Sequence, residues 1–376
     1  MSWRIPLFRI DWDESDLRAV ETVIRSGMSW SSGPSITEFE AELARYTANR
    51  CAVTFNSGTS ALHAALAAHG IGSGDEVIVP SFTFVATANA PLFVGATPVF
   101  ADIEEETFGL DPGDVQEKIT DRTKALLPIH YAGCPCRIRE LSEIAADHDL
   151  VLIEDAAEAF GAEVGGKKVG SYGDSAMLSF CQNKIITTGE GGAMVTDSPE
   201  LAERLKLLRS HGREETGDYF STCGAMDYVA LGYNFRLPTM AAALGLSQLR
   251  RVESLIRGRK KAADFYRKGI RKDVPECTVP DVPAGYRHVY QMFPVLCRDR
   301  ETLASCLEAE GIMTKVYFPP AHLTRFHHDV RGDRSHLPVT EKVAREILSL
   351  PFHPGLPEAD AEFVMAAMRR CYDGDA

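Results

Sequence analysis

A single lysine stands in an unusual setting within the segment SFCQNKIITTGEGGAMVTD, which spans residues 179–197. Lys184 comes shortly after an apolar, strand-like stretch that ends near Ser179, and a run of Thr and Gly residues follows it. A lone lysine is usually a solvated surface group. On a short irregular segment beyond a buried strand, however, a lysine can be desolvated and become nucleophilic. Lys184 is therefore a candidate for covalent chemistry, with Ser179 as a nearby hydroxyl group.

Two adjacent acids follow another apolar, strand-like stretch in LVLIEDAAEA, residues 150–159. Side chains alternate across a strand, so we expect one of Glu154 and Asp155 to point into a cleft at the strand end and the other to point away. The alternative interpretation is a carboxylate that caps the helix that follows, where negative charge is favourable.

A third motif, NSGTSAL at residues 56–62, places a glycine and hydroxyl residues between a strand and a helix. Free N–H groups at a helix N-terminus can hold a phosphate, and a glycine lets the ligand approach the backbone. Gly58 and Thr59 are the candidates. An ordinary Ser or Thr N-cap is the alternative, and no GK[ST] sequence follows that would make this a Walker motif.

Aromatic residues supply the fourth motif, PSFTFVATANA at residues 80–90. Phe82 and Phe84 come just past a predicted strand, where a ring could stack on a ligand. Phenylalanines are most often buried in the core, so a packing role is the alternative.

The elements that must position these residues alternate between strand-like and helix-like patterns over the first 250 residues. Strand patterns at 51–56, 75–80 and 150–155 are examples, as is the Ala-rich helix pattern at 60–70. This alternation predicts an α/β fold in which helices cover both faces of a mostly parallel sheet. Ligands bind such sheets at the carboxyl ends of the strands, where all four motifs fall.

The pattern changes after this region. Residues 238–272 predict one or two long helices that link two parts of the chain, and they are rich in Arg and Lys toward the end. Strand and helix patterns of a smaller α+β unit follow. We expect a large domain at 1–250 and a smaller C-terminal domain at 251–376.

Composition excludes several classes of function. The formal net charge of -13 argues against a general nucleic-acid binder and against an anionic-membrane binder. No leader-like or bilayer-spanning apolar run is visible, and the nine cysteines are expected to be reduced and mostly buried, which indicates a soluble cytoplasmic protein. No metal site is expected, since Cys134 and Cys136 are too closely spaced and the adjacent His327 and His328 should point apart.

Together, a phosphate cradle, a stacking aromatic, an acid and a lysine are what pyridoxal 5′-phosphate (PLP) requires. The chain also resembles the sugar aminotransferases of the DegT/DnrJ/EryC1/StrS family almost from end to end. The motifs that carry the resemblance include SGPSITEFEAELARYT, NSGTSALHAAL, GSGDEVIVPSFTFVATANA, VLIEDAAEAFGA, SFCQNKIITTGEGGAMVTD and LGYNFRLPTMAAALGLSQL. The resemblance implies PLP fold type I, the fold of aspartate aminotransferase.

The resemblance also implies a role for each site residue. Lys184 would form the Schiff base with PLP and later move the proton, and Asp155 would pair with the pyridine nitrogen. Phe84 would stack on the ring, while the phosphate would be held by Gly58, Thr59 and Ser179. Asn234, in GYNFR, is similar to an asparagine that reaches the cofactor of the neighbouring subunit, which implies a homodimer with shared active sites.

The implied substrates are a nucleotide-linked keto sugar and an amino donor, with glutamate as the usual donor. NKIITTGEGG and Glu158 are similar to perosamine-synthase-like members, which favours transfer to C4 of a 4-keto-6-deoxyhexose. Arg236 and His322 are further substrate candidates, and Arg213 with the Lys260 and Lys261 region could offset the substrate's charge. A C3-specific aminotransferase, a PLP-dependent sugar dehydratase or lyase, and a non-catalytic PLP-binding regulator stay open as alternatives.

Overall fold

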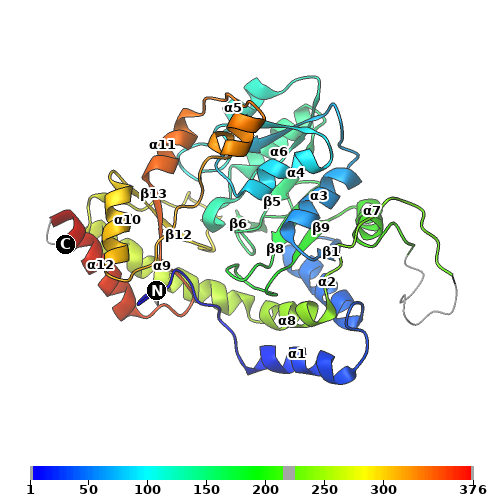
Figure 1. The fold of residues 1–376 in the computed structure, drawn as a ribbon, viewed down its shortest axis with the longest axis horizontal. Coiled ribbons are helices and arrows are strands. Elements are labelled where there is room, and N and C mark those ends of the chain that lie inside the picture. The colour runs from blue at the N-terminus through cyan, green and yellow to red at the C-terminus, as the bar shows by residue number, and fades with distance from the viewer. Residues whose placement is uncertain (1–2, 215–224, 374–376) are drawn as a thin grey trace.

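A seven-stranded sheet lies at the centre of the larger part of the molecule (Figure 1). The computed structural model describes residues 3–214 and 225–373. Across the sheet the strand order is β1-β9-β8-β5-β4-β2-β3. The bounds are β1 (Cys51–Phe55), β2 (Glu76–Pro80), β3 (Thr97–Ala101), β4 (Thr123–Leu126), β5 (Val151–Asp155), β8 (Ser175–Ser179) and β9 (Gly192–Thr196).

Neighbouring strands of this sheet are parallel except at β9, which runs antiparallel to both β1 and β8. This confirms the α/β class and the mostly parallel sheet. The strand pattern of β9 was not anticipated, because GAMVT directly follows a Gly-rich loop and is short. Its direction matters for the site: Ser179 of β8 pairs with Gly192 of β9, so Lys184 lies in the loop that joins two adjacent strands.

The remaining elements of this part are mostly helices. They are α1 (Glu14–Ser26), α2 (Pro34–Thr47), α3 (Gly58–Ala68), α4 (Val85–Phe93), α5 (Pro112–Lys118), α6 (Ile138–Asp147) and α7 (Pro199–Arg209), with a short η1 (Tyr131–Gly133). The short strand β6 (Glu163–Val164) pairs with both β7 (Lys167–Lys168) and β11 (Tyr286–Arg287) in a separate three-stranded sheet.

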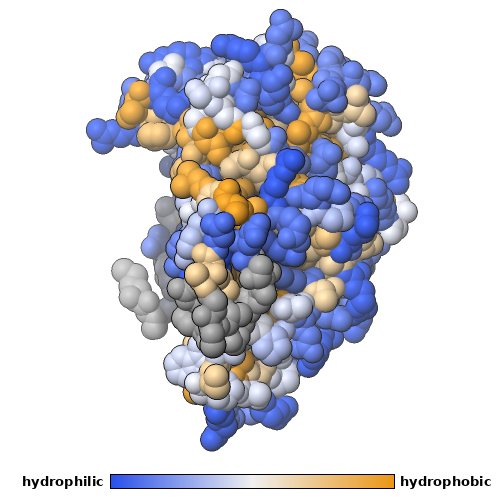
Figure 2. Space-filling view, turned by 90° about the vertical axis from the view of Figure 1, so that its right-hand side faces the viewer, coloured by the Kyte–Doolittle hydropathy of each residue, from blue (hydrophilic) through white to orange (hydrophobic). Residues whose placement is uncertain are grey.

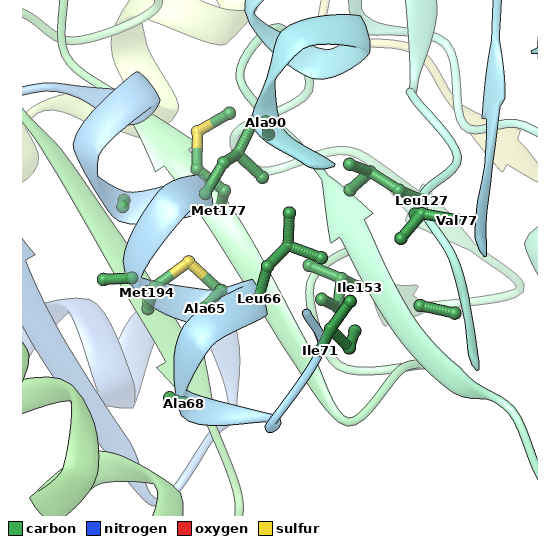
Figure 3. Close-up of a cluster of buried hydrophobic side chains, with 14 of the residues drawn as sticks. Ala65, Leu66, Ala68, Ile71, Val77, Ala90, Leu127, Ile153, Met177 and Met194 are labelled. Atoms are coloured by element: carbon green, nitrogen blue, oxygen red, sulfur yellow. The ribbon is translucent and has the colours of Figure 1, made fainter. Parts of the chain in front are cut away.

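Alternation along the strands directs side chains to two cores, one on each face of the sheet. In β8, Met177 packs with α3, α4 and α7, whereas Ala176 and Leu178 pack with α2 and with α8 (Thr239–Leu249) on the other face. Figure 3 shows Leu66 of α3 beside Ile153 of β5 in the first of these cores. The Ala-rich sequence of α3 lets the helix lie close to the sheet. Fully burying a leucine side chain such as Leu66 contributes about 2 kcal/mol to the free energy of folding.

The predicted linking segment forms two helices, α8 (Thr239–Leu249) and α9 (Val252–Asp273), as the sequence allowed. Arg251 leaves the helical conformation between them, with φ -116° and ψ 12°. Its guanidinium forms ion pairs with Asp11, Asp13 and Asp16 of the N-terminal segment. The break therefore lies where the N-terminal segment is attached.

The C-terminal part has its own core. Its elements are β10 (Cys277–Thr278), β12 (Phe293–Cys297), α10 (Arg300–Ala309), η2 (Ala321–Leu323), η3 (Phe326–Val330), α11 (Pro338–Glu346), β13 (Ile347–Leu350) and α12 (Glu358–Asp373). Apart from Ile5, every buried member of this core comes from residues 263–368. This separate core supports our proposal that the chain divides into two domains near residue 250.

One expectation about the cysteines is wrong. Cys306 of α10 and Cys371 of α12 form a disulfide, with their Cα atoms 6.1 Å apart. The two residues are 65 positions apart and meet only because α10 packs against α12, so their spacing carried no signal. Six other cysteines are free thiols, four of them buried as expected, and Cys223 lies outside the described residues.

Within residues 3–214 and 225–373, no helix combines the length and the apolar character that crossing a bilayer requires.

Candidate functional site

A cavity of about 450 Å³ opens at the carboxyl ends of β1, β2, β5 and β8. Lys315, Tyr317 and Phe318 of the C-terminal part line its other side. Seven of the residues that the sequence predicted line this one cavity: Gly58, Thr59, Phe84, Asp155, Glu158, Ser179 and Lys184. Parallel strands bring their ends to one edge of a sheet, and the cavity lies at that edge.

The N-terminus of α3 forms one end of the cavity. Ser57 is the N-cap, and its hydroxyl accepts a hydrogen bond from the Ser60 N–H at 3.1 Å. Gly58 and Thr59 begin the first turn, where backbone N–H groups have no acceptor within the helix. The cap and the phosphate cradle are therefore compatible, because different residues supply them.

Glycine is required where this turn meets β9. A Cβ atom on Gly192 would lie 2.6 Å from the Gly58 nitrogen and 2.7 Å from the Ser57 carbonyl carbon. Both are backbone atoms, which cannot give way as a flexible side chain can. Gly192 thus lets the first turn of α3 lie directly on the strand that follows the Lys184 loop.

The two adjacent acids face opposite ways, as alternation predicted. Asp155 faces the cavity, where its carboxylate accepts hydrogen bonds from the Thr87 hydroxyl at 2.7 Å and the Ala157 N–H at 3.1 Å. Burial raises the pKa of the Asp155 carboxyl, although these two hydrogen bonds and the charge of Lys184 oppose the shift. A cation beside Asp155 would relieve this penalty.

Glu154 points away from the cavity into the protein. It accepts hydrogen bonds from the backbone N–H groups of Gly170, Tyr172 and Gly173 and pairs with His130 at 3.0 Å. Burial acts to raise the pKa of Glu154, but these bonds outweigh it and hold the pKa below its usual value. Glu154 therefore fixes the structure around β5 and leaves Asp155 as the acid of the cavity.

Lys184 and Glu158 face each other across the cavity floor. The Lys184 Nζ lies 3.6 Å from Glu158 Oε1, and Glu158 Oε2 accepts a hydrogen bond from the Ala132 N–H at 2.8 Å. Burial raises the pKa of Glu158, while the charge of Lys184 and the Ala132 N–H lower it, and burial prevails. The Glu158 carboxyl group therefore keeps its proton up to a higher pH than an exposed glutamate would.

The Thr residues after Lys184 hold the loop in shape. The Thr187 hydroxyl donates to the Phe180 carbonyl at 3.1 Å, and the Thr188 hydroxyl donates to the Glu190 carbonyl at 2.7 Å. The Thr188 N–H also donates to Phe180 at 2.9 Å. These contacts explain the hydroxyl-rich sequence: a short loop that must turn back into β9 uses side chains to satisfy its own backbone.

The two phenylalanines of the fourth motif divide between core and cavity. Phe82 is fully buried and packs on Tyr131, with ring centroids 4.9 Å apart. Phe84 remains 58% exposed and lines the cavity, with its ring centroid 5.8 Å from that of Phe318. The packing alternative is thus correct for Phe82, and Phe84 presents a ring to the cavity.

The chain is similar in sequence to proteins of a known family. Residues 11–369 match the DegT/DnrJ/EryC1/StrS aminotransferase family. The chain belongs to that family. It is 40% identical over 367 residues to the GDP-perosamine synthase of Caulobacter vibrioides, covering 96% of this chain and 95% of the relative. It is 38% identical over 338 residues to an Acidithiobacillus ferrooxidans UDP-N-acetyl-3-dehydro-alpha-D-glucosamine 3-aminotransferase, covering 89% and 88%.

Solved structures agree with this assignment. The chain is 38% identical to DesV from S. venezuelae, a structure with a ketimine intermediate, at a TM-score of 0.89 and 98% coverage of both chains. It also matches the PLP form of the putative sugar aminotransferase Spr1654 from Streptococcus pneumoniae, with 26% identity, a TM-score of 0.91 and 99% coverage of both chains. This aminotransferase therefore has the PLP fold type I architecture, in a PLP-dependent family.

Three predicted residues of this aminotransferase lie outside the cavity lining. Asn234 is exposed, and its carbonyl accepts from the Asn56 side chain at 3.4 Å. Arg236 donates to the Ser210 hydroxyl at 3.2 Å. His322 is buried, with its Nδ1 2.6 Å from the Ser81 hydroxyl.

The candidate cations on α9 are also absent from the lining of this cavity, and each is paired with an acid. Lys260 pairs with Asp264 at 2.8 Å, and Lys261 pairs with Glu358 at 3.2 Å. Among residues 3–214 and 225–373, the lysines that line the cavity are Lys184 and Lys315.

Several lining residues of this aminotransferase were missed. Lys315, Tyr317 and Phe318 come from the C-terminal part, far along the chain from the four motifs, and no local pattern marks them. Thr83 and Thr87 lie inside the motif that was quoted for its phenylalanines, so their hydroxyl groups were a usable signal. Their hydroxyl oxygens lie 2.8 Å apart, and Thr87 supports Asp155.

Proposed function

We propose that this chain is a PLP-dependent aminotransferase that transfers an amino group from glutamate to C4 of a nucleotide-linked 4-keto-6-deoxyhexose. One observation carries the proposal: Lys184 and Asp155 face the same cavity, which the first turn of α3 and Phe84 also line. A nucleophilic amine, a buried acid, backbone N–H groups and an exposed ring are the donor set that PLP needs.

The residues of the cavity fit PLP in chemical terms. The Gly58 and Thr59 N–H groups and the Ser179 hydroxyl would hold the phosphate, and Phe84 would cover a ring face. Asp155, whose pKa burial raises, would hold the protonated pyridine nitrogen and would gain a counter-charge by doing so. When bound, PLP supplies a conjugated ring that withdraws electrons from the carbon atom attached to the transferred nitrogen.

Lys184 would act as the general base and acid. Its uncharged amine could accept a proton from the substrate carbon that carries the transferred nitrogen. Its ammonium form could then return the proton to the carbon atom on the other side of that nitrogen. Glu158, 3.6 Å from the Lys184 Nζ, stabilises the ammonium form. The pair would therefore keep the proton inside the cavity between its removal from one carbon atom and its return to the other.

Two features support transfer to C4. The relative named GDP-perosamine synthase is 40% identical over nearly the whole chain, and Glu158 stands where the perosamine-synthase-like members carry the same acid. The C3 alternative has its own support, since a relative named as a 3-aminotransferase is 38% identical. Lys184 favours amino transfer over the dehydratase alternative, because related dehydratases have histidine at that position.

We also propose a homodimer with shared active sites. Asn234 is exposed and lies outside the cavity of its own chain, as a residue that serves a partner would. A partner chain could cover exposed apolar side chains, among them Phe93, which is 48% exposed, and Leu231, which is 81% exposed. Figure 2 shows hydrophobic patches on the face near α3 and α7. A cytoplasmic location stays a prediction.

The experiment that tests this function supplies purified protein with PLP, glutamate labelled with heavy nitrogen, and a panel of GDP-, UDP- and dTDP-linked 3-keto and 4-keto sugars. We expect label in a 4-amino sugar, measured by mass spectrometry and located by NMR. Lys184→Ala should incorporate none. Label at C3 would select the alternative aminotransferase, and loss of water without label would select the dehydratase.

A further inference from the structure

Two buried polar side chains lie behind the cavity wall, and the mechanism above does not use them. Gln291 and Arg259 are each 4% exposed. Arg259, in α9, donates from Nη1 to the carbonyl oxygens of Tyr290 and Gln291, both at 3.2 Å. Burial lowers the pKa of Arg259 to about 10. A buried guanidinium held by carbonyl groups is costly, so its placement calls for a specific role.

The side chain of Gln291 is bonded to the loop that carries the lysine. Its Nε2 donates to the carbonyl oxygen of Asn183, the residue immediately before Lys184. That carbonyl belongs to the peptide group whose N–H is the Lys184 N–H, and this N–H donates to Cys181 at 3.0 Å. Because a peptide group is planar, holding both of its polar atoms fixes the start of the Lys184 side chain.

The backbone of Gln291 is connected to the acid on the other side. Its N–H donates to the Ala132 carbonyl at 2.8 Å, and the Ala132 N–H donates to Glu158 Oε2 at 2.8 Å. The remaining oxygen of Glu158 is the one that lies 3.6 Å from Lys184 Nζ. One residue is thus connected to both members of the amine–carboxylate pair.

The backbone of residues 289–291 packs closely against the backbone of Ala132 and Gly133. A Cβ atom on Gly133 would lie 2.9 Å from the Gln291 nitrogen and 3.0 Å from the Tyr290 nitrogen, and Gly133 has φ +96°. The Val289 N–H donates to the Gly133 carbonyl at 3.0 Å. Backbone lies directly on backbone here, so a displacement of residues 289–291 moves Ala132 as well.

We propose that Gln291 is a positioning residue that sets the distance and orientation between the Lys184 amine and the Glu158 carboxylate, with Arg259 as its anchor on α9. The inference rests on the proposed function for its catalytic meaning. Proton transfer is sensitive to small displacements, since an error of about 1 Å can cost about a hundredfold in rate. Gln291 acts through Asn183 and Ala132 and does not line the large cavity.

The test compares Gln291→Met with the matched control Gln248→Met. Gln248 is also buried, at 2% exposure, but its Nε2 donates to the Asp11 carbonyl at 3.0 Å and to Asp16 Oδ2 at 2.6 Å, in the N-terminal segment. The first readout is hydrogen–deuterium exchange of residues 181–188 in PLP-free protein. We expect exchange about tenfold faster in Gln291→Met and unchanged in Gln248→Met.

The second readout is kinetic. In Gln291→Met, kcat should fall about tenfold, while KM for glutamate and for the sugar should change by less than about threefold. Arg259→Lys keeps the cation but changes its donors, and it should shift both readouts in the same direction. It serves as the second route if Gln291→Met does not fold.

Wild-type exchange and wild-type kcat in Gln291→Met would overturn the proposal, as would equal effects in Gln248→Met, which would indicate a general loss of stability. The exchange readout needs neither PLP nor substrate. A wild-type protein that transfers no nitrogen would therefore contradict the proposed function alone, and a loosened loop in Gln291→Met would still support the positioning role.

Discussion

At the scale of single residues, the charge state of Glu158 connects the structure to pH. Burial raises the pKa of this carboxyl, and the charge of Lys184 only partly offsets the shift. Glu158 therefore loses its charge at a higher pH than an ordinary glutamate as the solution is acidified. Below that pH the ammonium form of Lys184 loses its counter-charge, so activity should decline.

Glu158→Gln tests this directly. Glutamine keeps the acceptor for the Ala132 N–H but does not titrate, so we expect kcat at neutral pH to fall about tenfold to a hundredfold. In the wild type, we expect titration of Glu158 to lower kcat on the acidic side of the pH profile. This decline should be absent in the variant. An unchanged acidic limb in Glu158→Gln would assign it to another group.

Residue-level reasoning from the sequence identified part of this site for physical reasons. Strand alternation separated the roles of Glu154 and Asp155, and the helix start after β1 identified Gly58. Lys315 and Tyr317 could not be found in this way, because only the packing of the C-terminal part brings them to the cavity. Phe84 and Phe82 differ in exposure, although their local sequence patterns are alike.

At the scale of elements, the site depends on how closely α3 lies on β9. Gly192→Ala would place a Cβ atom 2.6 Å from the Gly58 nitrogen, so the first turn of α3 must move. We expect the affinity for PLP to fall at least about tenfold, because the turn supplies the phosphate donors. PLP binding is measured by absorbance titration of the apo protein.

Gly72→Ala is the control for this variant. A Cβ atom there would meet only the Val94 carbonyl oxygen, at an ordinary 3.7 Å. Its PLP affinity should equal that of the wild type. If Gly192→Ala bound PLP with wild-type affinity, the phosphate would have to be held elsewhere.

The elements themselves followed the sequence pattern where that pattern was long or strongly periodic. The strands β1, β2, β5 and β8 and the helix α3 appear where they were predicted. The antiparallel direction of β9 had no local signal, because direction depends on which strand lies beside it. The break between α8 and α9 depends on Arg251, whose partners are in the N-terminal segment.

At the scale of the whole molecule, the central prediction is that two chains share each active site. A mixture of inactive Lys184→Ala and impaired Asn234→Ala chains can form a dimer in which one site has both residues intact. If mixing is random, half of the dimers are mixed and each has one working site of two, so about a quarter of wild-type activity should return. Sedimentation of the unmixed variants checks that both still dimerise.

No recovery of activity in chains shown to exchange subunits would mean that each chain builds its site alone. The disulfide between Cys306 and Cys371 belongs to the same scale, since it depends on the contact between α10 and α12. This pairing could not be derived from local patterns, because it depends on a contact that forms only when two distant segments come together.

The most direct measurement for the account as a whole is to locate the covalent attachment of PLP. The protein is incubated with PLP, treated with borohydride, digested and analysed by mass spectrometry. We expect the reduced pyridoxyl phosphate group on the peptide that contains Lys184, and Asp155→Ala should lower the yield without moving the position. Attachment at another lysine, or at none while the protein remains folded, would contradict the account.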